Sequence, residues 1–307
     1  MCDCACVWGG EDPHVHIPHM HTQHISHTTH YTPHVDTCTH ITHMCAHTTH
    51  YTTRGYTCIH TLHTDTNTLT KTKNQMKITL IGAGNLATNI GLALHSAGHI
   101  IVQVYSRQLA NASCLSSRLD ATAIDQLDKV NDLADIYIFS LKDSVLQSAI
   151  EKVCKHNTNK VFLHTAGSMN MQLFEGYATR FGVLYPMQTF SKDRPVDFKS
   201  IPCFIEVSDS KTLECIRSLA LSISEKVYIL SSHDRKYLHL SAVFACNFVN
   251  HCYEIAAEIL HQHDIPFEVL QPLIDETARK IHMLSPRVAQ TGPAVRYDKN
   301  VIEAQLN

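Results

Sequence analysis

The stretch Met76-Lys-Ile-Thr-Leu-Ile-Gly-Ala-Gly-Asn-Leu-Ala87 decides the fold of this 307-residue chain. Its first half has the apolar pattern of a buried strand, and its second half reads Gly82-x-Gly84-x-x-Ala87 at the start of an amphipathic helix. Gly82 permits a tight turn, Gly84 lets the backbone approach a pyrophosphate, and Ala87 lets the helix lie close to the strand. The free N–H groups at the helix start then face the phosphate charge. The stretch predicts a dinucleotide-binding turn, whose cofactor-binding residues are Gly82, Ala83, Gly84, Asn85 and Leu86.

Short apolar strands and helices alternate after this turn, which is typical of a doubly wound parallel sheet with right-handed crossovers. Strands are expected at 78–81, 100–105, 121–124, 135–140, 161–165 and 182–185, and helices at 85–96, 109–119 and 143–155. We therefore expect an α/β Rossmann domain over residues 76–190.

The pattern changes after Pro186. Two more strands are expected at the edge of the sheet, and the rest is mostly helical. The expected strands are 203–207 and 227–230, and the expected helices are 211–223, 234–263, 266–284 and a last one from about 300. This predicts a mainly α-helical second domain, 191–307. Its last helix stops at Asn307, so we expect an incomplete C-terminus.

Residues 1–75 have a different composition, with 14 of the 24 histidines and six of the 12 cysteines on a background of threonine. So little apolar surface cannot offset the entropy of ordering, which predicts disorder. A zinc- or nickel-binding tract is the alternative, although no paired ligand spacing is present. The same residue types arise from reading through CA- and TA-rich repetitive DNA, and Met76 lies where a natural start would fall. We therefore interpret 1–75 as an upstream extension from a mis-assigned start codon, outside the native protein.

Composition excludes several functional classes. The chain has 25 Lys and Arg against 28 Asp and Glu, which gives no support to nucleic-acid binding. No signal peptide is expected, and no membrane span is expected because the chain has no apolar run of about 18 residues. The six cysteines of 76–307 lack framework spacing and are expected to be reduced thiols of a cytoplasmic protein. No metal is assigned to this part.

The second expected strand ends in Tyr105-Ser106-Arg107, without the acid that holds the ribose of NAD about 20 residues after the glycines. A hydroxyl and a guanidinium would bind a 2′-phosphate, which a carboxylate would repel. Ser106 and Arg107 therefore favour NADP. The alternative is that Arg107 is an ordinary solvated residue.

Ligands of such sheets lie outside the carboxyl ends of the strands. This places cofactor contacts at Ser140, Leu141, Thr165 and Gly167, and substrate contacts at Ser168 and Gln188. Turn chemistry around Gly167 is the alternative role of Thr165 and Ser168.

The long helix carries the candidate proton donor, His239, because reducing a carbonyl requires an acid beside the developing alkoxide. Asn247 and Asn250, 8 and 11 positions later, return towards the same face. We assign Asn247 to orienting substrate or water and Asn250 to substrate binding. The alternative is that His239 is a satisfied polar residue at the domain seam.

Five segments add a family resemblance: the glycine turn with Ser106-Arg107, Leu163-His-Thr-Ala-Gly-Ser168, Gly182-Val-Leu-Tyr-Pro-Met-Gln-Thr-Phe190, Ala242-Val-Phe-Ala-Cys-Asn-Phe-Val-Asn-His251 and Thr291-Gly-Pro-Ala-Val-Arg296. They resemble bacterial Rossmann-like proteins that carry a C-terminal helical domain of unknown function (the 2520 family) and are classed as NADP-dependent oxidoreductases. The layout is more distantly similar to pyrroline-5-carboxylate reductases and 6-phosphogluconate-type dehydrogenases. The resemblance covers 76–307 and implies a homodimer through the helical domain.

The resemblance also bears on the substrate. β-Hydroxyacid dehydrogenases use a lysine followed four residues later by an asparagine, whereas Lys236 is followed here by Leu240. Imine reductases need less acid help, and a turn at Gly292 with Arg296 as a carboxylate clamp would suit them. We expect a small carboxylated carbonyl or imine as substrate. A non-catalytic redox-sensing module and a deazaflavin-dependent oxidoreductase are the alternatives.

Overall fold

The computed structural model describes residues 60–61, 75–155, 159–194 and 196–306. All of them belong to one compact unit, residues 55–307. The predictions made for 1–59 and 62–74, disorder or a metal-binding tract, lie outside the described residues.

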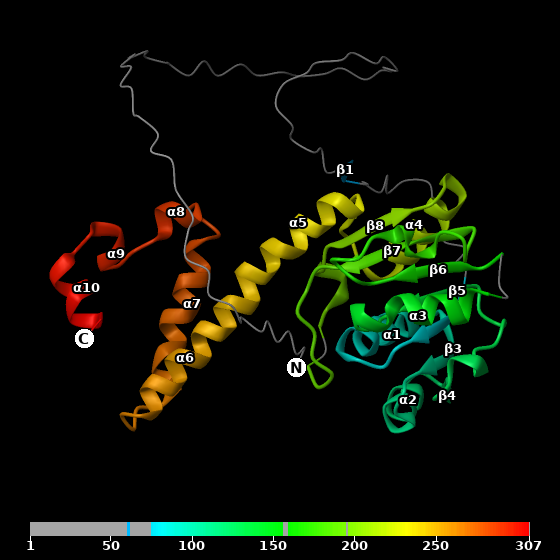
Figure 1. The fold of residues 1–307 in the computed structure, drawn as a ribbon, viewed down its shortest axis with the longest axis horizontal. Coiled ribbons are helices and arrows are strands. Elements are labelled where there is room, and N and C mark those ends of the chain that lie inside the picture. Colours follow the sequence, from blue (N-terminus) through cyan, green and yellow to red (C-terminus); the bar gives the residue numbers. More distant parts are fainter. Residues whose placement is uncertain (1–59, 62–74, 156–158, 195, 307) are drawn as a thin grey trace, which may run out of the picture. The chain divides into compact units, whose positions relative to one another are not determined.

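A nine-stranded sheet organises the first part of this unit (Figure 1), in the order β1-β9-β8-β7-β6-β5-β2-β3-β4. The strands are β1 (His60–Thr61), β2 (Lys77–Ile81), β3 (Ile100–Tyr105), β4 (Thr122–Ile124), β5 (Ile136–Phe139), β6 (Val161–His164), β7 (Arg180–Pro186), β8 (Cys203–Val207) and β9 (Val227–Ile229). The six strands from β4 to β7 in this order are all parallel, with the crossover order of a Rossmann sheet. The predicted doubly wound α/β class is confirmed.

Helices pack on both faces of this sheet and bury its apolar strands. One face is covered by α1 (Asn85–Ser96), α2 (Leu109–Ser116) and α4 (Ser210–Ile223), which share a core cluster with Ile78 and Leu80 of β2. The other is covered by α3 (Asp143–Cys154) and the 3₁₀ turn η2 (Met171–Phe174), against Tyr137 and Phe139 of β5. Strand side chains alternate between faces, so a parallel strand with apolar residues at every position supplies both clusters.

The sheet continues beyond residue 190, where the sequence places the domain boundary. β8 runs antiparallel to β7, and β9 then pairs parallel with β8. These are the two strands expected at the sheet edge, joined by α4 as predicted.

Two residues of the 1–75 segment take part in the sheet. His60 and Thr61 form β1, which pairs antiparallel with Ile229 and Tyr228. An edge strand offers unpaired backbone groups to any neighbouring segment, so this short pairing requires no apolar pattern.

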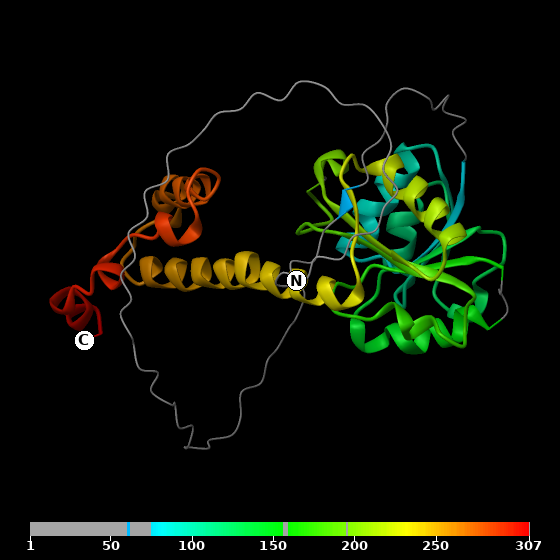
Figure 2. The same cartoon turned by 90° about the horizontal axis from the view of Figure 1, so that it is seen from above.

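The remaining elements are helical. They are α5 (Ser232–Ala242), the π-helical segment η4 (Val243–Phe248), α6 (Val249–His261), the 3₁₀ turn η5 (Phe267–Leu270), α7 (Gln271–Lys280), α8 (Pro286–Ala289), α9 (Pro293–Arg296) and α10 (Lys299–Leu306). The ribbon passes from α5 through η4 into α6 without a break (Figure 2). None of the helices in the described ranges is long and apolar enough to cross a membrane.

The helical pattern expected over 234–263 is present as α5, η4 and α6, and the structure adds a π-helical segment within it. A π-helical turn holds about one residue more than an α-turn, so the side chains after it are rotated by about 100°. Apolar spacing could not reveal this, because one extra residue blurs a helical period without abolishing it.

Candidate functional site

The glycine turn joins the carboxyl ends of three neighbouring strands. The Gly82 N–H donates to the carbonyl of Tyr105 at the end of β3, at 2.9 Å. A Cβ at Gly82 would lie 2.1 Å from the carbonyl oxygen of Ser140, which follows β5, and its φ is +133°. Both the left-handed conformation and the close approach require glycine here.

Gly84 opens α1 and leaves room beside the backbone. It is exposed and caps the helix with φ −81° and ψ −171°, without a side-chain hydrogen bond to the cap. A Cβ there would meet no described atom within 4 Å. Asn85 and Leu86 are half-buried in the first turn, and Ala87 is fully buried beneath it. The free N–H groups and the positive end of the helix dipole therefore face open space of the kind that a pyrophosphate fills.

The predicted 2′-phosphate residues lie directly after β3. The Ser106 N–H donates to Ile124 at 3.1 Å, and its hydroxyl accepts weakly from the Gln108 N–H at 3.4 Å. Arg107 is exposed and has no ion pair within the described part of the chain. A hydroxyl and an unengaged guanidinium thus occupy the strand end, with no carboxylate in the run from Ser106 to Gln108.

Several of the residues expected near the nicotinamide already have protein partners. The Ser140 N–H donates to Ile81, and Ser140 and Leu141 are half-buried. Thr165 is buried, and its hydroxyl donates to the carbonyl of Phe139 at 3.4 Å. The hydroxyl of Ser168 donates to the carboxylate of Asp143, at the start of α3. The exposed Gln188 accepts from its neighbour's N–H at 2.8 Å.

His239 of α5 lies against the loop that follows β6. A Cβ at Gly167 would lie 2.6 Å from its Nδ1 atom, so the ring packs on the backbone of that loop. Nδ1 is also 3.0 Å from the hydroxyl of Tyr185 on β7, and the two rings meet edge to face with their centroids 6.0 Å apart. The structure therefore brings His239 together with the predicted residues Gly167 and Ser168 at the carboxyl edge of the sheet.

Tyr185 was missed by the sequence reasoning. It is buried, and burial raises the pKa of its hydroxyl. Its position just before Pro186, at the end of a predicted strand, was the available signal. The contact with His239, 54 positions later, could not be derived from spacing.

Arg235, one turn before His239, holds the start of α5 to the sheet. Its side chain is 1% exposed and donates to Glu206 Oε2 of β8 at 2.6 Å and to the carbonyl of Met169 at 2.5 Å. Glu206 also accepts from the N–H and hydroxyl of Ser232. This buried Arg235–Glu206 pair sets the position of His239, and sequence reasoning missed it because the partners are 29 positions apart.

His164 is a second buried histidine beside the site. It has no exposure, stacks on Phe174, and its Nδ1 accepts from the Ala166 N–H at 3.2 Å. Burial, and then the charge of Arg235, lowers its pKa to about 3. A histidine kept neutral in this way serves the packing of the loop rather than proton transfer at ordinary pH.

The other helical candidates lie farther along the chain. Asn247 and Asn250 are exposed, in η4 and α6 respectively. Because η4 changes the helical phase between His239 and Asn250, the shared face of His239 and the two asparagines stays a prediction. Gly292 has φ +108°, and Arg296 pairs with Asp298 at 3.2 Å. No contact in the described part joins either of them to His239.

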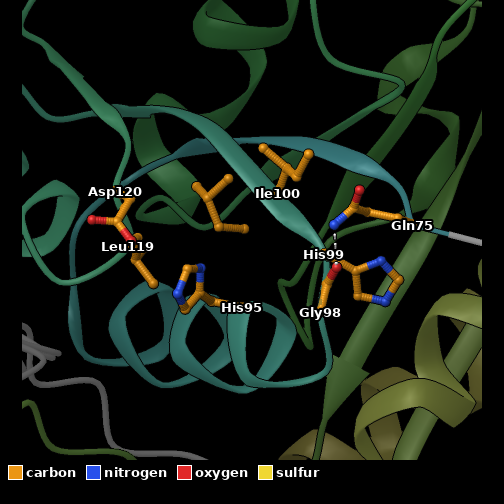
Figure 3. Close-up of a pocket in the computed structure, with 8 residues that line it drawn as sticks. Gln75, His95, Gly98, His99, Ile100, Leu119 and Asp120 are labelled. Atoms are coloured by element: carbon orange, nitrogen blue, oxygen red, sulfur yellow. Dashed lines mark hydrogen bonds between the residues drawn. The ribbon is translucent and has the colours of Figure 1, made fainter. Parts of the chain in front are cut away.

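Two cavities lie away from this edge of the sheet. One, of about 270 Å³, lies where β3 begins and is lined by Gln75, His95, Gly98, His99 and Asp120 among others (Figure 3). The other, of about 390 Å³, lies between α1 and α4. Neither is lined by a predicted site residue.

Comparison with known proteins gives matches along most of the chain. A model described as a Rossmann-like domain matches residues 62–186, and a model of the domain of unknown function 2520 matches residues 201–307. The first begins 14 residues before Met76, so similarity reaches slightly into the segment interpreted as an extension. A search of curated proteins finds no match.

Among solved structures, the chain is 49% identical to a candidate NADP oxidoreductase from Bacteroides fragilis. The match covers 76% of this chain and 90% of that one, with a TM-score of 0.73. A protein from Thermotoga maritima is 20% identical over 74% and 87%, with a TM-score of 0.57. A pyrroline-5-carboxylate reductase from Coxiella burnetii is 18% identical over 76% and 92%, with a TM-score of 0.51. These last two show a shared fold alone.

Proposed function

Because the chain belongs to the family of Rossmann-like proteins that carry the C-terminal domain of unknown function 2520, we propose that it is an NADP(H)-dependent oxidoreductase. The observation that carries the proposal is the open space beside Gly84 at the start of α1, which we call the phosphate cradle. It is accompanied by Ser106 and Arg107 at the end of β3, where the sequence has no carboxylate. The relative from Bacteroides fragilis is itself described as an NADP oxidoreductase candidate, in agreement with this cofactor.

The substrate in this proposal is a small carboxylated carbonyl or imine. When bound, NADPH supplies the hydride, and His239 supplies the proton that a developing alkoxide requires. Ser168 and Gln188 lie on the loops that follow β6 and β7 and would contact the substrate. Asn247 and Arg296 keep their predicted roles of orienting the substrate and clamping its carboxylate.

Charge reversal at Arg107 tests the cofactor. We expect Arg107→Asp to weaken NADPH binding at least tenfold in isothermal titration, because a carboxylate repels the 2′-phosphate, while NADH binding is retained. Arg118→Asp is the matched control, since Arg118 is also exposed but follows α2. Unchanged preference in Arg107→Asp would contradict the assignment.

Turnover separates the enzyme from its alternatives. We expect NADPH to raise Tm more than NADH or a deazaflavin does, and a screen of keto and imino acids to reveal NADPH oxidation. A redox-sensing module would bind the cofactor without turnover and would tolerate His239→Gln.

The same proposal assigns a second copy of the chain as the partner of the helical part. No residue described in η4, α6 or α7 is buried, although these helices carry large apolar side chains. Phe244, Phe248, Ile255, Ile259 and Leu273 are between 44% and 63% exposed. So much apolar surface on amphipathic helices indicates an interface, and a two-fold dimer lets the same surface cover itself.

A further inference from the structure

The hydroxyl of Tyr185 fixes which nitrogen of His239 is free. It lies 3.0 Å from Nδ1, while no described residue bonds Nε2 of the half-buried ring. A phenolic hydroxyl both donates and accepts. It can therefore donate to Nδ1 of a neutral imidazole and accept from Nδ1–H of an imidazolium, so one contact holds the ring in both charge states.

Two other contacts leave the ring little freedom to turn. The backbone at Gly167 lies so close that an added Cβ would be 2.6 Å from Nδ1 and 2.7 Å from Cγ. Below the ring, the Arg235–Glu206 pair holds the first turn of α5. Arg235, one turn before His239, is thus paired with Glu206 of β8, and the uncharged Tyr185 is the hydrogen-bond partner of the ring.

We propose that Tyr185 is the positioning residue of this site, holding Nδ1 of His239 so that Nε2 faces the substrate crevice as the proton-donating atom. The inference rests on the proposed function, in which His239 is the acid. In the reduction, the carbonyl carbon gains the hydride of NADPH, the carbonyl oxygen takes the Nε2 proton of the imidazolium, and the imidazole returns to neutral. Tyr185 exchanges no proton with the substrate.

Imidazole NMR on the full-length protein tests this without a substrate. The ¹⁵N signals of His239 are identified by their loss in His239→Gln. We expect the neutral His239 ring of wild type to show one dominant tautomer, held by the Tyr185 hydroxyl at Nδ1. Tyr185→Phe keeps the aromatic ring and removes the hydroxyl, so we expect the Nδ1 signal to shift and the two tautomers to mix.

Tyr228→Phe is the matched control. Tyr228 is also on the sheet, its ring stacks on Phe204 with the centroids 5.4 Å apart, and no hydrogen bond in the described part joins it to His239. We expect its His239 signals to match wild type. Identical His239 signals in wild type and Tyr185→Phe would overturn the inference.

Kinetics then separates this inference from the proposed function. With any substrate found by the NADPH screen, Tyr185→Phe should lower kcat about tenfold and change the pH profile, with KM for NADPH unchanged. Altered NMR signals without any turnover would keep the positioning role and reject the reaction. Turnover, with NMR signals that Tyr185→Phe leaves unchanged, would keep the proposed reaction and reject the positioning role.

Discussion

Gly82 and Gly84 lie two positions apart in one turn, and glycine is needed at each of them for a different reason. Gly82 is required by the chain itself, since a Cβ would meet Ser140 at 2.1 Å. Gly84 has open space around it and a φ that other residues adopt. The absence of a side chain there leaves room for a ligand beside the backbone. The two glycines can therefore be separated experimentally.

Alanine at each glycine is expected to give opposite results. Gly82→Ala should lower the free energy of unfolding by about 1–3 kcal/mol from backbone strain, besides displacing the end of β5. Gly84→Ala should keep the wild-type Tm but weaken NADPH binding at least tenfold, because its methyl group occupies the phosphate cradle. Calorimetry and NADPH titration measure the two effects. A loss of Tm in Gly84→Ala without loss of affinity would contradict the cradle.

His164 predicts a pH dependence of stability. Its pKa is about 3 in the folded chain and 6.5 ordinarily, so below pH 6.5 the unfolded chain takes up a proton that the folded chain does not. This contribution is fully present above pH 6.5 and is lost as the pH falls, by about 2 kcal/mol between pH 6.5 and 4.5. Urea unfolding of His164→Asn should show a shallower pH dependence than wild type over this range. Equal slopes would show that His164 is not the cause.

The residues that sequence alone could find are those whose role is local. The glycine turn and Ser106-Arg107 depend on neighbours within a few positions, so their pattern can be read from a short stretch of sequence. Tyr185, Arg235 and His164 depend on partners from other strands and helices. Their burial becomes visible only once β7, β8 and α5 are packed together.

At the scale of elements, the start of α5 depends on a buried ion pair. Arg235 is 1% and Glu206 14% exposed, so removing one partner leaves a charge with little solvent. Arg235→Met should therefore cost about 3–5 kcal/mol of unfolding free energy.

The double variant Arg235→Met with Glu206→Met should cost less than Arg235→Met alone, because it leaves no buried charge. Denaturant unfolding of Arg235→Met, Glu206→Met and the double variant gives the coupling energy. Strictly additive losses would mean that the two side chains act independently.

Element boundaries followed from apolar spacing wherever an element was regular. The parallel strands and α1, α3 and α4 were predicted almost at their observed limits, because buried strands and helices with one apolar face carry strong patterns. β1 was not predicted, because its two residues pair with β9 through their backbone groups and carry no apolar pattern. η4 was not predicted for the opposite reason, since it preserves an apolar pattern while changing its phase.

For the whole molecule, the exposed apolar helices predict self-association. We expect wild type to be a dimer by light scattering after gel filtration. The paired change Phe244→Glu and Phe248→Glu should give monomer, because charges on this surface cannot be buried in a two-fold interface. Leu133→Glu is the control, since Leu133 is 59% exposed but lies between β4 and β5. A monomeric wild type would remove the second copy from the proposal.

The π-helical segment η4 separates two tasks along one continuous helix. His239 lies before it, and the exposed apolar positions of α6 lie after it. Adding or deleting a single residue within η4 would leave both halves intact and turn one against the other by about 100°. The length of η4 thus sets the rotation of α6 about the helix axis relative to α5. Relatives that differ by one residue there could keep the same chemistry while presenting a different surface to their partner.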